Sequence, residues 1–105
     1  MENLIIIYWD ESFPPDEQTL RLRLQQEGLS SYAWSNGPGD IYPPHSHSYH
    51  KIIYVARGSI TWVIGKEQRE YETSAGDRLE LPRGTLHAAR VGSKGVTCLE
   101  AHLDG

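Results

Sequence analysis

The sequence predicts an all-β domain, built as a sandwich or a barrel. After Gly28, short segments of four to eight residues alternate with turn signals such as Asn36-Gly37-Pro38-Gly39 and Arg83-Gly84. Many short strands at this spacing are typical of an antiparallel sheet, because the turns are too short to hold crossover helices. The length of 105 residues leaves room for one such domain.

A strand and a helix are expected before this sheet. The apolar run Leu4–Trp9 favours a strand, since three isoleucines and two aromatic residues suit a pleated surface. Residues 16–27 favour a short helix with Asp16 as its N-cap and Gly28 at its end, although the alternating leucines at 20–24 are a competing strand signal. Two pairs spaced four residues apart are expected to bridge one helical turn: Glu17 with Arg21, and Arg23 with Glu27.

Six further strands follow from the turn signals, among them turns at Arg57-Gly58 and at residues 92–95. We therefore expect an N-terminal extension of strand and helix at residues 1–30 and a barrel at residues 31–105. The expected strands are Tyr32–Ser35, Ile52–Ala56, Ser59–Ile64, Gln68–Thr73, Arg78–Leu81 and Val96–His102.

Composition excludes several classes of protein. The net charge of -4 argues against nucleic-acid binding, which depends on basic patches. Cys98 is the sole cysteine, so neither an internal disulfide nor a cysteine-built zinc site is possible. The run Leu4–Trp9 is far shorter than the roughly 20 residues of a membrane span, and it lacks the flanks of a signal peptide. A cytoplasmic protein without membrane contact is therefore expected.

Four histidines carry the functional signal: His45, His47, His50 and His87. On a strand, His45 and His47 point to one face, as do Tyr49 and Lys51, whereas His50 points to the other. Nitrogen ligands lie about 2.0–2.2 Å from a transition metal. If His87 completes the site, its ligand nitrogen and those of the first two histidines must lie within roughly 3–4 Å of one another.

Two motifs in this chain resemble those of the cupin superfamily. The first runs from Gly39 through His45-Ser46-His47 to Gly58, with Lys51 where the family has a glutamate. The second, residues 76–87, matches the pattern of a glycine, Pro-x-Gly and a histidine at every fixed position. A final asparagine of that motif is replaced by Val91. The resemblance implies an antiparallel jelly-roll β-barrel, here a small single-domain protein of the conserved-barrel type.

The resemblance also implies one divalent transition metal, iron, manganese, nickel, copper or zinc, held by His45, His47 and His87. Lys51 would repel that ion, yet three imidazoles alone form workable open sites. Lys51 and His50 remain candidates for contact with a substrate or with the metal ligands. Glu100 is a further candidate, as a carboxylate that could replace the missing one.

The leading functional prediction is a small cupin that binds a metal and acts on, or binds, a small molecule. The alternatives are a metal-free cupin that binds or senses a small molecule without catalysis, and a metal-free barrel that binds a partner protein. A homodimer is expected, because Leu4–Trp9 is very apolar for an exposed edge strand and unpaired edges recruit partners. The reaction and the substrate stay open, since cupins host many chemistries.

Overall fold

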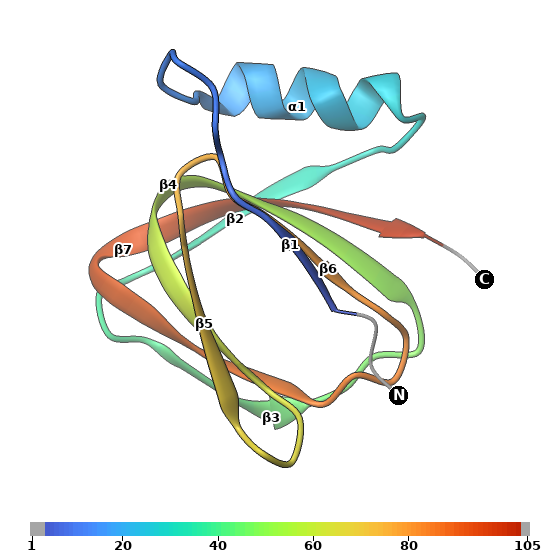
Figure 1. Cartoon of the computed structure of the whole chain (residues 1–105), viewed down its shortest axis with the longest axis vertical. Coiled ribbons are helices and arrows are strands. Elements are labelled where there is room, and N and C mark those ends of the chain that lie inside the picture. Colours follow the sequence, from blue (N-terminus) through green and yellow to red (C-terminus); the bar gives the residue numbers. More distant parts are fainter. Residues whose placement is uncertain (1–3, 104–105) are drawn as a thin grey trace.

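The computed structural model describes residues 4–103 and confirms an all-β fold with a short helix. All strand pairs in this part of the chain are antiparallel, in the order β1-β6-β4-β7-β2, with β3 on β7 and β5 on β4. The sheet curls into a barrel, and α1 lies outside it against β4 and β7 (Figure 1). The elements are β1 (Ile5–Ile7), α1 (Glu17–Gln26), β2 (Tyr32–Asn36), β3 (Ile41–His45), β4 (His50–Ile64), β5 (Arg69–Ser74), β6 (Arg78–Leu81) and β7 (His87–Leu103).

The two longest strands, β4 and β7, correct the sequence prediction. Each was expected to be interrupted by a turn, at Arg57-Gly58 and at residues 92–95, but each continues and bends, with register shifts around Gly58. Gly58 has a φ of 78°, and a Cβ there would lie 2.0 Å from the carbonyl oxygen of Gly95. Glycine therefore permits a bulge and a close backbone approach where it had indicated a chain reversal.

Strand β3 was not predicted, and β1 is shorter than expected. Pro43 and Pro44 argue against a strand because they cannot donate to a sheet. Strand β3 tolerates them because β7 is its one partner among the described residues. Strand β1 covers Ile5–Ile7 and pairs with β6, so it belongs to the same sheet as the barrel strands.

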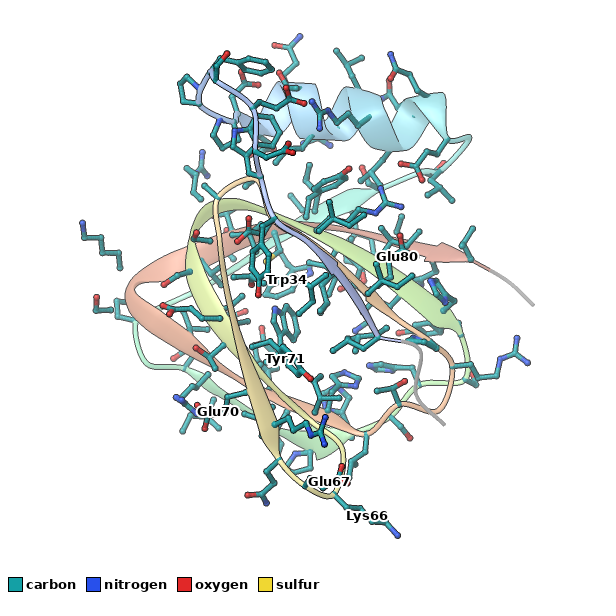
Figure 2. The ribbon with its side chains drawn as sticks, in the orientation of Figure 1. Trp34, Lys66, Glu67, Glu70, Tyr71 and Glu80 are labelled. Atoms are coloured by element: carbon teal, nitrogen blue, oxygen red, sulfur yellow. The ribbon has the colours of Figure 1, made fainter. Side chains whose placement is uncertain are left out.

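The core has two parts because successive side chains of β4 point to opposite faces. Ile53 and Val55 point into the barrel and pack with Trp62, whereas Ile52 and Tyr54 pack with the helix side of the sheet. Figure 2 shows Trp34 and Tyr71 inside the barrel, and Lys66 pointing away from it at the turn between β4 and β5. The continuous apolar run in β4 thus contributes side chains to both parts of the core.

Helix α1 is capped as predicted. Asp16 accepts a hydrogen bond from the Thr19 backbone N–H at 2.8 Å, and Gly28 follows the helix with a φ of 78°. The Glu17–Arg21 pair forms at 2.5 Å. No helix in residues 4–103 is long and apolar enough to cross a membrane.

The predicted pair of Arg23 with Glu27 does not form. Arg23 contacts Glu11 at 3.1 Å, and Glu27 receives two hydrogen bonds from Arg78 of β6. The Arg78 side chain is 10% exposed and also contacts Glu80 of its own strand. A largely buried guanidinium requires carboxylate partners more than an exposed one does, so the tertiary contact prevails and ties α1 to the sheet.

Candidate metal centre

A cavity of about 350 Å³ opens inside the barrel. Aromatic side chains make up much of its wall, while ionisable side chains gather at the ends of β3, β4 and β7. A hollow of about 750 Å³ lies beside β1 and β5, but its lining contains no histidine. The smaller cavity is lined by Tyr32, Trp34, Tyr42, His45, His47, Tyr49, Lys51, Ile53, Trp62, His87, Ala89 and Glu100.

Three of the predicted histidines converge in this cavity. His45 ends β3 and lies opposite His87, the first residue of β7, while His47 lies in the connection from β3 to β4. One ring nitrogen from each lies within 4.8 Å of the others. The ring centroids of His45 and His87 are 4.3 Å apart, and those of His45 and His47 are 4.8 Å apart.

Backbone carbonyls orient two of these rings. The Nδ1 atom of His45 lies 2.7 Å from the Pro43 carbonyl oxygen, and that of His87 lies 2.9 Å from the Thr85 carbonyl oxygen. A carbonyl can only accept, so each Nδ1 carries a hydrogen and donates it. In the neutral ring, the lone pair is then on Nε2, the arrangement found in histidine ligands of metals.

Burial keeps two of the rings uncharged. The pKa of His87 is lowered to about 4, mainly by burial; the neighbouring His45, Lys51 and His47 add to the lowering, and the hydrogen bond to the Thr85 carbonyl opposes it. Burial, followed by the charge of Lys51, also lowers the pKa of His47. A metal ion binds neutral imidazole, so neither ring has to lose a proton at neutral pH.

The donor set fits a divalent transition metal. Three neutral imidazoles suit zinc, iron, nickel or copper and leave a coordination position open. The 4.8 Å limit exceeds the expected 3–4 Å, so some ligand nitrogens must close by about 1 Å around an ion. Imidazoles near the cavity mouth can make that adjustment, since His45 and His47 are partly exposed.

Lys51 lies in the cavity beside the histidines, at the place where the cupin motif has a glutamate. Its Nζ atom is 3.2 Å from Nε2 of His47 and 3.6 Å from Oε2 of Glu100. The residue is 9% exposed, so its ammonium does not extend into solvent. Its positive charge opposes a cation bound at the histidines, and the negative charge of Glu100 offsets it.

Glu100 of β7 is the counter-ion of Lys51, and both of its oxygens are occupied. Oε1 accepts from Trp34 Nε1 at 2.9 Å, while Oε2 accepts from the Tyr32 hydroxyl at 2.6 Å and lies 2.6 Å from Nε2 of His102. Although Glu100 lines the same cavity, it is outside the group of side chains that could jointly hold an ion. The sequence indicated which face of the last strand Glu100 occupies. It could not indicate the four partners of the carboxylate, because they lie on three different strands.

His50 is the one candidate that the structure places away from the cavity. Its side chain points to the opposite face of β4 from Lys51, as alternation along a strand requires. There its Nε2 atom lies 3.3 Å from Oε1 of Glu80 on β6. Cys98 is fully buried, and burial raises the pKa of its thiol to about 12, so it is a core residue.

The antiparallel barrel and its three convergent histidines agree with the cupin architecture that the two sequence motifs implied. The family model for the cupin domain matches residues 34–101. The chain therefore belongs to the cupin family. A comparison with curated proteins finds no match.

Solved structures with the same fold include enzymes. Oxalate decarboxylase of Bacillus subtilis is 26% identical over 73% of this chain and 21% of its own, with a TM-score of 0.63. The polyketide cyclase RemF of Streptomyces resistomycificus is 26% identical over 70% of this chain and 54% of its own, with a TM-score of 0.62. An RmlC-like cupin of Shewanella frigidimarina shares the fold at 18% identity, 73% and 67% coverage, and a TM-score of 0.63. This chain spans about a fifth of the decarboxylase, as the 21% coverage indicates.

Proposed function

We propose that this protein holds one divalent transition metal through His45, His47 and His87 and takes a small molecule at the open position of that metal. The observation that carries the proposal is the convergence of three ring nitrogens within 4.8 Å in a cavity of about 350 Å³. Such an ion would act as a Lewis acid toward the bound molecule. The similar oxalate decarboxylase has Mn(II) centres, which supports a divalent transition metal at this site.

The chain's own residues would define the rest of the site. Aromatic walls would surround the bound molecule, and the carbonyls of Pro43 and Thr85 keep two histidine rings in place. Lys51 would meet a polar group of the ligand close to the histidines. The pocket is within the usual volume range for small-molecule sites, about 300–1,000 Å³.

A second candidate function is a metal-free cupin that binds or senses a small molecule. It is favoured by the contact between Lys51 Nζ and His47 Nε2 at 3.2 Å, which gives that imidazole a partner without any metal. No buried side-chain nitrogen or oxygen in the described residues lacks a hydrogen-bond partner. The fully buried polar atoms of this part of the chain therefore have partners before an ion is added.

Elemental analysis of protein purified without a histidine tag separates the two functions. The proposal expects about one equivalent of a transition metal after loading and desalting, lost in His87→Ala. His50→Ala is the matched control, because it removes a neighbouring histidine that lies on the other face of β4. Binding of less than a tenth of an equivalent by the wild type would favour the metal-free function, and equal loss in both variants would refute this ligand set.

We also propose a homodimer joined through β1. Within the described residues, this strand is hydrogen-bonded only to β6, so its other edge is unpaired. Ile5 and Ile7 are 43% and 54% exposed, which leaves apolar surface beside that edge. A mass near one chain in sedimentation at micromolar concentration would refute the dimer. A cytoplasmic location stays a prediction from the sequence.

A further inference from the structure

The buried Lys51–Glu100 pair is the feature of this cavity that the cupin motif does not account for. Both residues are at most 9% exposed, and their charged atoms are 3.6 Å apart. The free-energy cost of removing two charges from water can exceed the energy of their attraction. Replacing a buried ion pair by apolar residues of similar volume therefore often leaves a protein equally stable or more stable. A buried ion pair beside the three histidines that could hold a metal therefore calls for a functional explanation.

Glu100 is rigidly held and stays ionised. Burial raises the pKa of its carboxyl, but hydrogen bonds from Tyr32, His102 and Trp34, with the charge of Lys51, outweigh burial and lower it overall. Since both oxygens already accept hydrogen bonds, the carboxylate cannot turn toward the histidines without losing them. It neutralises Lys51 in place.

The resulting charge balance changes when a metal is added. In the metal-free cavity the charges of Lys51 and Glu100 offset one another across 3.6 Å. A divalent ion leaves two positive charges without a counter-charge. A glutamate at position 51, as in the cupin motif, would remove both of them. This chain's loaded cavity thus needs an anion from outside, because uncompensated buried charge is costly.

Metal binding would also take away a hydrogen-bond partner of Lys51. Its ammonium now contacts Nε2 of His47 at 3.2 Å. If a metal binds that nitrogen, the lone pair is used, and if it binds the other nitrogen, Nε2 carries a hydrogen. Either way His47 can no longer accept from Lys51, and an ammonium has three hydrogens to place. An anion beside the histidines would be within reach of it.

The walls of the cavity indicate what that anion carries. Trp34 and Tyr42 meet edge to face with ring centroids 5.8 Å apart, and Tyr49 stacks on His47 at 4.9 Å. Trp62 is also in the lining. Aromatic surfaces favour a flat apolar ring in offset or edge-to-face contact. The cavity of about 350 Å³ has room for one ring with an acidic substituent.

We propose that the metal-loaded cavity binds a small aromatic carboxylate, and that Lys51 makes the binding of carboxylate and metal cooperative. This inference rests on the proposed metal-binding function. The carboxylate supplies the missing negative charge and the missing acceptor for Lys51, and its ring lies against the aromatic wall. By linkage, the carboxylate raises the affinity for the metal by the same factor as the metal raises the affinity for the carboxylate.

Calorimetric titration of Zn²⁺ into the metal-free protein tests the proposal. The titration is run with no additive, with benzoate, and with benzamide, which has nearly the same shape but no charge. Benzoate should raise the Zn²⁺ affinity by about tenfold, within the usual range of coupling between sites, and benzamide by less than about twofold. In the reverse experiment, the affinity for benzoate should be lower for the metal-free protein than for the Zn²⁺-loaded protein by the same factor.

A pair of lysine variants assigns the effect to Lys51. Lys51→Met removes one of the two uncompensated charges, so the benzoate effect should fall to about threefold or less. Lys66→Met is the matched control, because Lys66 is exposed at the β4–β5 turn and points away from the barrel (Figure 2). It should keep the full effect. The comparison of benzoate with benzamide on the wild type needs no variant and tests the proposal even if Lys51→Met fails to fold.

The outcomes distinguish this inference from the proposed function. If neither the wild type nor Lys51→Met binds Zn²⁺, the proposed function is refuted and this inference falls with it. If Zn²⁺ binds but benzoate and benzamide act alike, the metal site stands and the inference is overturned. The same holds if benzoate binds equally well with and without the metal, or if Lys51→Met keeps the full benzoate effect.

Discussion

Lys51→Glu is the most informative single change in this protein, because it reverses the charge closest to the three histidines. In the wild type, the Lys51 ammonium lies 3.2 Å from His47 and is neutralised by Glu100. The variant replaces a cation by a carboxylate at the place where the cupin motif has one. We expect tighter metal binding and a less stable metal-free protein.

The two effects differ in sign and in size. Two unit charges 4 Å apart interact by about 4 kcal/mol at an effective dielectric constant of 20, so reversing one charge beside a divalent ion is a large perturbation. Desolvation of the carboxylate and repulsion from Glu100 offset much of it. We take about 1.4 kcal/mol, a tenfold gain in metal affinity, as the lower bound. Breaking the buried pair should cost the metal-free protein about 3–5 kcal/mol.

Calorimetry and urea unfolding measure both effects on the same protein. Lys51→Met is the control, since it removes the positive charge without adding a ligand and should increase metal affinity by a smaller factor. Saturating metal should restore more stability to Lys51→Glu than to the wild type, because binding is tighter. If Lys51→Glu binds metal no better than the wild type, position 51 does not face the ion, and the assignment of the first motif is wrong.

Three further changes test other parts of the structure. Glu100→Gln leaves Lys51 buried without a counter-ion and should lower the free energy of unfolding, measured in urea, by about 3 kcal/mol. The control Glu70→Gln breaks a surface pair with Arg90 and should lower it far less. Equal losses in the two variants would contradict the burial of the Lys51–Glu100 pair. The lowered His87 pKa of about 4 means that the unfolded chain binds more protons than the folded one between pH 6.5 and 4. The metal-free protein should therefore lose about 3 kcal/mol as pH falls through that window, and His87→Gln should flatten this slope in pH-dependent unfolding. Ile7→Lys should convert the proposed dimer to a monomer in sedimentation, and an unchanged mass would exclude β1 as the interface.

Much of the fold and of the site could be predicted from the sequence, because these features depend on residues that are close together in the chain. The caps of α1 depend on Asp16 and Gly28 alone. Alternation along a strand places Lys51 on the cavity side and His50 on the other. The spacing of the two glycine- and histidine-containing motifs was sufficient to identify the cupin fold, and the family match at residues 34–101 confirms it.

Other features depend on which segments lie side by side. Glycine at positions 58 and 95 looks the same in sequence whether it forms a turn or a bulge, and the pairing of β4 with β7 decides between them. The partners of Glu100 are equally non-local, since Tyr32 is 68 residues away in the chain. Its contact with Lys51 arises from the register between β4 and β7. Such register depends on the summed packing of the whole barrel, so only the tertiary structure shows that the lysine in the metal motif has a buried counter-ion.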